Sequence, residues 1–149
     1  MLKKGFSMIE LMIGVAILVF ALTALLASYA NMFLLSDVAR DNSIATNAIR
    51  SKIEEVKKQS FTSLDAYNGT IFNLDGFSPS DAKGIIEVSN VAGFINLKEI
   101  RVVGCFVSRG RVIGEDTNLN GILDVGTGED VNNNSRLDSP AEIVTLITK

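Results

Sequence analysis

The sequence has no histidine, no tryptophan and one cysteine, and these absences exclude several classes of site. Without histidine there is no Ser-His or Cys-His nucleophile pair, no imidazole acid–base chemistry and no histidine-containing zinc site. The single cysteine, Cys105, excludes an internal disulfide and a thiolate metal cluster. An enzyme would have to rely on carboxylates alone, as glycoside hydrolases do. The carboxylates gather in one Asn- and Gly-rich segment instead, so we expect no enzymatic activity.

Excess positive charge is also lacking. The net charge is −3, whereas a nucleic-acid-binding protein usually carries a basic stripe, so we expect no nucleic-acid partner. The negative charge is concentrated, because residues 115–138 hold six carboxylates and one base, Arg136. From Ser36 onward, the remainder has ten acids and eleven bases. The 149 residues suit one domain, and 47% hydrophobic content is too high for a disordered chain.

The N-terminus contains a long apolar run that follows two lysines. Leu11–Leu35 has no charged residue, and these 25 residues would rise about 37 Å as a helix, enough to cross a bilayer core of about 30 Å. Lys3 and Lys4 would hold the preceding end in the cytoplasm. A secretory signal peptide has a shorter apolar stretch and a small-residue cleavage site. A plain signal anchor would not need Glu10, an ionisable group at the start of the span.

The segment Lys3-Lys4-Gly5-Phe6-Ser7-Met8-Ile9-Glu10-Leu11 resembles the class III signal of type IV prepilins and of the pseudopilins of type II secretion. The resemblance covers about the first 30 residues. It implies cleavage between Gly5 and Phe6 by a prepilin peptidase, followed by N-methylation of the new Phe6 amine. It also implies that Glu10 pairs with the amine of a neighbouring subunit. Such a pair would set the assembly register, because a misplaced subunit leaves both charges unpaired in a low-dielectric environment.

The helix is expected to continue beyond the membrane. No proline precedes Pro79, and Val38, Ala45, Ile49, Ile53 and Val56 form one apolar stripe. Turn residues then punctuate a loop-rich connector from residue 60 to 84. Strands are expected at Ile85–Val91, Leu97–Ser108, 111–113 and Ile143–Ile147. We therefore predict an α+β protein: a leader at 1–5, a long helix at 6–59 with 6–35 in the membrane or filament core, and a small antiparallel β head at 60–149, as in the pilin fold. Cys105 would be a buried, unreactive thiol in the main strand.

Residues 114–141, here called the acidic repeat, contain two copies of one loop. Seven of fourteen positions recur between the first loop (114–127) and the second loop (128–141). Positions 1, 3, 5 and 9 are Asp116, Asn118, Asn120 and Asp124 in the first loop, and Asp130, Asn132, Asn134 and Asp138 in the second. This spacing lets alternate side-chain oxygens point to one centre, and the backbone carbonyl of Ile122 or Arg136 at position 7 would add another.

The acidic repeat resembles the calcium loops of EF-hand, dockerin and thrombospondin type 3 repeats. It departs from them because Thr127 and Ala141 replace the bidentate Glu at position 12, and Ser135 replaces a glycine. Glu129 is a candidate additional ligand. With so few charges we expect weak, structural Ca²⁺ binding, with a Kd on the order of 10⁻⁴–10⁻³ M. The alternative is a solvated Asp/Asn/Gly turn without metal, although turn preference does not explain the 14-residue period.

Together these features predict a structural subunit of a type IV pilus or a type II secretion pseudopilus. Its partners would be copies of itself or other pilins, the prepilin peptidase that also methylates, and the inner-membrane assembly platform. It would cross the inner membrane once before entering a surface pilus or a periplasmic pseudopilus. The region 43–64 resembles minor pilins of the pilus-modification group. The alternative is a membrane-anchored calcium-binding or adhesion module that does not polymerise.

Overall fold

The computed structural model describes residues 7–149, which fall into two compact units. The first unit extends to Asp37, and the second is Val38–Lys149. One helix, α1 (Met8–Lys57), contributes to both. The leader expected at 1–5, together with Phe6, lies outside the described residues.

In the first unit, α1 exposes every side chain from residue 7 to residue 36. Its large apolar side chains range from 46% exposed at Leu34 to 81% at Met8. The Thr23 and Ser28 hydroxyls donate to the carbonyls of Phe20 and Ala24, so the helix itself satisfies these polar groups. The helix is long and apolar enough to cross a membrane.

In the second unit, the remainder of α1 becomes amphipathic. Ala45, Ile49, Ile53 and Val56 are buried, as their spacing predicts, whereas Val38 is half-buried. After α1, the chain forms a 3₁₀ helix, η1 (Phe61–Tyr67), and a short strand, β1 (Thr70–Asn73). The expectation of a loop-rich connector was wrong here. β1 was not predicted because turn residues such as Gly69 flank it. Its pairing with β2 is a tertiary contact that the local sequence does not indicate.

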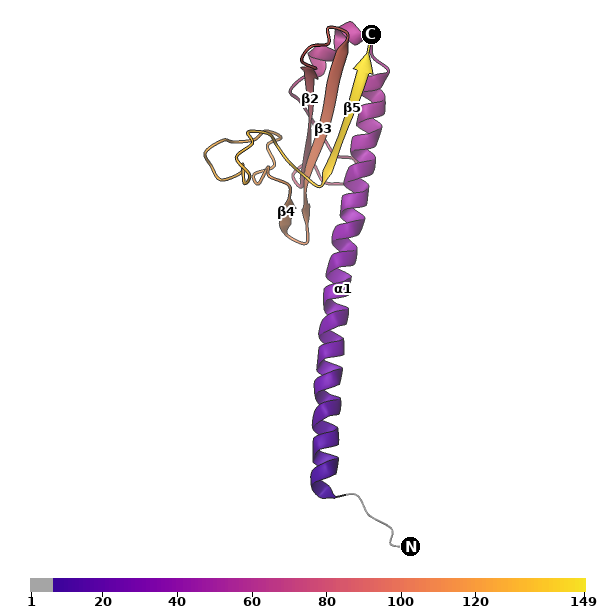
Figure 1. Cartoon of the computed structure of the whole chain (residues 1–149), viewed down its shortest axis with the longest axis vertical. Helices are drawn as coiled ribbons and strands as arrows, with labels where there is room; N and C mark the ends of the chain where they lie inside the picture. The colour runs from indigo at the N-terminus through magenta and orange to yellow at the C-terminus, as the bar shows by residue number, and fades with distance from the viewer. Residues whose placement is uncertain (1–6) are drawn as a thin grey trace. The chain divides into compact units, whose positions relative to one another are not determined.

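The five strands form one antiparallel sheet, drawn in Figure 1. The others are β2 (Ala82–Asn90), β3 (Leu97–Ser108), β4 (Arg111–Ile113) and β5 (Ala141–Thr148). β3 has the predicted bounds, whereas β2 begins three residues before the predicted strand and β5 is longer at both ends. β2 lies along one edge of β3, and both β4 and β5 lie along the other.

The main core lies between the sheet and the second half of α1. Its strand residues include Ile86, Val88, Ile100, Val102 and Phe106. Gly104 of β3 allows close approach, because a Cβ there would lie 2.7 Å from Leu74 and 3.0 Å from Ile49. A long apolar helix packed through its second half on a small antiparallel sheet confirms the predicted α+β class.

The acidic repeat packs on part of the opposite face of the sheet. A second, smaller cluster joins Ile85, Val103 and Cys105 of the sheet to Leu137, with Leu119 and Leu123 packed against it. The repeat leaves the sheet after β4 and returns at β5, so both of its ends meet β3 at neighbouring positions, as Figure 1 shows. The Ser139 hydroxyl donates to the Gly104 carbonyl at 2.6 Å and fixes the returning end.

Candidate functional site

Glu10 lies in the first turn of α1 and is exposed. It carries the only charge between residues 7 and 36. Gly5 and Phe6, the residues expected to be cleaved and methylated, lie outside the described residues. The structure therefore places a single carboxylate at one end of a charge-free helical surface.

The first loop of the acidic repeat is organised by its own side chains. Both oxygens of Asp116 accept backbone N–H bonds, from Asn120 at 3.0 Å and from Gly121 at 2.7 Å. The Asn118 and Asn120 side-chain oxygens each accept the N–H two residues further on, at 2.9 and 2.8 Å. Their amide groups both donate to Oδ2 of Asp124, at 2.8 and 2.9 Å. Positions 1, 3, 5 and 9 therefore converge, and position 7, Ile122, contributes the N–H that Asn120 accepts.

The second loop repeats this geometry residue by residue. Asp130 accepts from the N–H groups of Asn134 and Ser135 at 3.0 and 2.9 Å. Asn132 and Asn134 accept from the second N–H beyond them and donate to Oδ2 of Asp138. The N–H that Asn134 accepts belongs to Arg136, at position 7. Positive φ angles recur at position 4 (Leu119 and Asn133) and at position 6 (Gly121 and Ser135), so the sequence duplication is also a duplication of backbone conformation.

Each loop provides a glutamate that accepts hydrogen bonds from the other loop. Glu129, which precedes Asp130 of the second loop, accepts N–H bonds from Thr117 and Asp124 of the first loop, both at 3.0 Å. Glu115, which precedes Asp116 of the first loop, accepts the equivalent N–H groups of the second loop, Val131 and Asp138, at 3.2 and 3.1 Å. Each loop is therefore closed by a carboxylate from the other, and the two fold as one unit. The sequence offered Glu129 only as a ligand and gave no signal for this exchange.

The buried carboxylates of this unit differ in pKa. Asp116 is 0% exposed, and desolvation by burial raises its pKa above the ordinary value, although N–H bonds from Gly121 and Asn120 oppose the shift. For Glu129 burial acts in the same direction, but hydrogen bonds from Asp124, Thr117 and Asn118 together outweigh it and lower the pKa. Hydrogen bonding from Asn132 is the main cause that lowers the pKa of Asp138.

Arg101, on the outer face of β3, connects the second loop to the sheet. Its side chain is 3% exposed and lies between two strand carboxylates. Nε donates to Glu142 at 2.6 Å, and Nη1 donates to Glu87 at 2.9 Å. Nη2 donates to the Leu137 carbonyl at 2.6 Å and to Oδ1 of Asp138 at 2.8 Å. The sequence analysis missed Arg101, although a lone arginine between Ile100 and Val102 of a strongly apolar strand was a usable signal.

The donor set of the repeat is of the kind that calcium takes, because carboxylate, amide and backbone carbonyl oxygens dominate it. Each loop nevertheless brings only two carboxylates at ligand positions. Within residues 7–149, no group of three or more Asp, Glu or Cys side chains is placed to hold a metal ion. In this conformation amide N–H groups point at Asp124 and Asp138. A cation would therefore require the Asn side chains to turn their oxygens inward.

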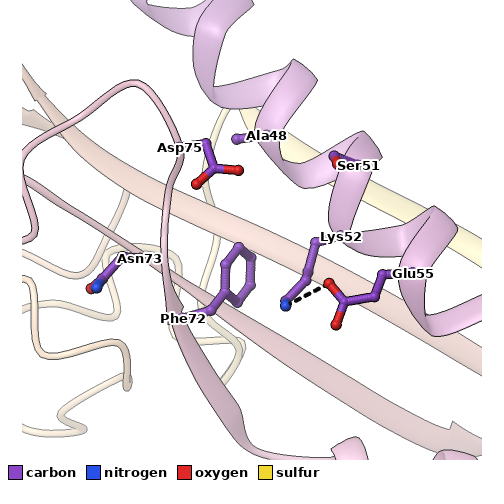
Figure 2. Close-up of a pocket in the computed structure, with 7 residues that line it drawn as sticks. All are labelled: Ala48, Ser51, Lys52, Glu55, Phe72, Asn73 and Asp75. Carbon is purple, nitrogen blue, oxygen red and sulfur yellow. Dashed lines mark hydrogen bonds and ion pairs between the residues drawn. The ribbon is translucent and has the colours of Figure 1, made fainter.

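Several hollows lie on the described residues, and one of them borders the acidic repeat at Arg136. Figure 2 shows one of about 100 Å³ between the second half of α1 and β1, where Lys52 bonds Glu55 at 2.8 Å and lies 5.5 Å from the Phe72 ring centroid. It is smaller than a cofactor site of roughly 300–1,000 Å³. A second hollow, of about 380 Å³, lies over the outer sheet face. The arginines in its wall, Arg101 and Arg136, are already paired with acidic side chains.

Cys105 is fully buried in β3, beneath the ends of the acidic repeat. Desolvation raises the pKa of its thiol to about 11. This environment agrees with the expectation of an unreactive thiol, because the thiolate is the reactive form.

Residues 1–26 match the family model described as the prokaryotic N-terminal methylation motif. No curated protein matches the chain, and no solved structure does. The motif and the apolar helix that begins within it fit a type IV pilin-like precursor, and such a precursor is processed by a prepilin peptidase. The pilin-like motif family is structural rather than enzymatic.

Proposed function

We propose that this chain is a structural subunit of a type IV pilus or of a type II secretion pseudopilus. The observation that carries the proposal is the N-terminal methylation motif at residues 1–26, which includes the start of the exposed apolar part of α1. The helix holds the precursor in the inner membrane, with the head on the far side from Lys3 and Lys4. After removal of residues 1–5 and methylation of Phe6, the assembly platform transfers the subunit into a helical filament with copies of itself or with other pilins.

Glu10 sets the register of the subunit in this proposal. An exposed carboxylate on an apolar helix is costly to transfer into a filament core unless a positive charge meets it. The Phe6 amine of a neighbouring subunit provides that charge. We expect Glu10→Ala to leave a processed, membrane-inserted protein that enters filaments poorly. Ser28→Ala is the matched control, because the Ser28 hydroxyl bonds only within its own helix. Equal amounts of both variants in sheared filaments would contradict the register role.

Processing is tested separately by mass. Gly5→Ala should leave the leader attached, detectable as an intact mass that still contains residues 2–5. Gly14→Ala is the control, because a Cβ at Gly14 would meet nothing within 4 Å and the position lies outside the scissile bond. Wild-type protein that keeps its leader in the native host would refute the proposal. It would favour instead a membrane-anchored adhesion module that does not polymerise.

The acidic repeat is proposed to bind calcium weakly and to stabilise the head. The support is the duplicated loop geometry and its oxygen-rich donor set. A Kd of about 10⁻³ M and about 10 mM Ca²⁺ would add roughly 1.4 kcal/mol to the free energy of unfolding, because the ion binds only the folded state. For a unit of this size that raises the melting temperature by about 5 °C.

The measurement is thermal melting of the full chain in detergent micelles, with EGTA, with Ca²⁺ and with Mg²⁺. Asp124→Asn is the informative variant, because it removes a ligand charge while preserving the side-chain shape. We expect it to abolish the calcium shift. An unchanged wild-type midpoint in Ca²⁺ would show that the loops are metal-free turns, and an equal response from Asp124→Asn would show that calcium does not bind through Asp124.

A further inference from the structure

The two loops of the acidic repeat are copies in backbone geometry but not in charge environment. At position 9, Asp124 and Asp138 each accept two asparagine amides through Oδ2. Oδ1 of Asp138 also accepts Nη2 of Arg101 at 2.8 Å. Among residues 7–149, no cation pairs with Asp124, so the first loop lacks an equivalent of Arg101.

Arg101 is well suited to hold a loop closed. Its guanidinium is almost fully buried and bonds Glu87 and Glu142, one carboxylate on each strand that flanks β3. This pairing fixes its orientation before the loop is engaged. Nη2, which also donates to Oε2 of Glu142 at 3.0 Å, reaches two successive groups of the second loop, the Leu137 carbonyl and the Asp138 carboxylate. Charge-assisted hydrogen bonds from a preorganised guanidinium are strong and geometrically specific.

We propose that Arg101 takes the place of a cation at the second loop, so that this loop stays closed without metal and only the first loop responds to calcium. The part concerning calcium rests on the proposed function above, whereas the role of Arg101 does not. The physical reason is occupancy of the oxygens. Nη2 of Arg101 already bonds Oδ1 of Asp138 at 2.8 Å, so a metal ion at the second loop would have to displace this charge-assisted hydrogen bond. The second loop is therefore held by Arg101 without metal, and the first loop is the one that responds to calcium.

The first experiment needs no metal. Hydrogen–deuterium exchange of the full chain in detergent and chelator would compare wild type with Arg101→Lys, because lysine cannot reach all of these acceptors. We expect amides of 131–138 to exchange about tenfold faster or more, since charge-assisted bonds are lost. Arg136→Lys is the matched control, because Arg136 is an exposed arginine of the same loop that pairs with Glu99 at 3.5 Å. Equal exchange in both variants would overturn the proposal.

A milder variant keeps the test informative if Arg101→Lys destabilises the sheet. Asp138→Asn removes the charge that Arg101 meets and preserves the shape of the side chain. We expect faster exchange in the second loop while the amides of β3 stay protected. Unchanged exchange in the second loop of this variant would also overturn the proposal.

The second experiment adds calcium to wild type. Slower exchange in 116–124 with no change in 131–138 would support the division between the loops. Equal protection of both loops with Arg101 in place would overturn it. Protection of neither loop would refute calcium binding in the proposed function, and the chelator experiment alone would then decide the role of Arg101.

Discussion

The exchange of glutamates between the loops predicts an asymmetric effect of two similar substitutions. Glu129 accepts from Thr117 twice, through N and Oγ1, and from the N–H groups of Asn118 and Asp124. Within residues 7–149, Glu115 accepts from two N–H groups, those of Val131 and Asp138, at 3.2 and 3.1 Å. Glu129→Gln keeps one oxygen for the Thr117 side but turns an NH₂ group toward the Asp124 N–H.

The expected magnitude follows from these contacts. A hydrogen bond to a charged acceptor contributes roughly 1.5–3 kcal/mol, but water can replace the acceptor at exposed amides. Because Thr117 and Asn118 are exposed and Asp124 is half-buried, we count one bond as fully lost. Glu129→Gln should therefore lower the opening free energy of the first loop by about 2 kcal/mol, which speeds its amide exchange about 30-fold. Glu115→Gln should change the second loop by less than about 1 kcal/mol, because Arg101 also holds that loop.

The assay is hydrogen–deuterium exchange of the full chain in detergent, read separately for peptides within 116–128 and within 130–140. The two substitutions are chemically identical and serve as controls for each other. The reciprocal arrangement would be refuted if either substitution accelerated amide exchange equally in both loops. It would also be refuted if Glu115→Gln accelerated exchange in the first loop and Glu129→Gln in the second.

Three further outcomes are expected. Ile49→Ala should lower the free energy of unfolding by about 2–5 kcal/mol, because Ile49 is fully buried, while Ile95→Ala, at a 96% exposed site, should leave the urea midpoint unchanged. Cys105 should resist alkylation at pH 8 and react rapidly in urea, because its pKa is raised to about 11 and the side chain is buried; fast labelling of the folded chain would contradict this placement. The lowered pKa of Glu129 provides stability above its unfolded value near 4.5, and this stability is lost as pH falls through the folded pKa. The melting difference between wild type and Glu129→Gln should therefore shrink from pH 6 to pH 3. The raised pKa of Asp116 acts in the opposite direction, and because the charge of Glu129 contributes to that rise, the opposing effect is weaker in Glu129→Gln.

The sequence predicted the elements whose local pattern agrees with their tertiary role. The stripe through Ala45 and Ile49 specifies a helix with one buried face, and the β-branched run of β3 specifies the central strand with its observed bounds. β1 escaped prediction because four strand residues between turn signals carry little information, and its pairing partner, β2, lies elsewhere in the chain.

For the acidic repeat, too, the sequence predicted the local geometry but not the contacts with other segments. Its period identified two equivalent loops, and the converging positions 1, 3, 5 and 9 follow from that spacing. Periodicity is a property of one segment, however, so it could not show that Glu115 and Glu129 are exchanged between the loops. Nor could it show that Arg101, on a strand that precedes the repeat, would form an ion pair with the second loop and not with the first.

The return of the acidic repeat to its point of departure has a consequence for how this surface can change over evolutionary time. Ile113 pairs with Phe106 and Ala141 pairs with Gly104, so the exit and entry points lie two residues apart along one strand, or about 7 Å. The chain between them can lengthen by a whole 14-residue copy without shifting the register of any strand. The outer face of the head can therefore diversify by duplication, while the face that packs on α1 is inherited unchanged.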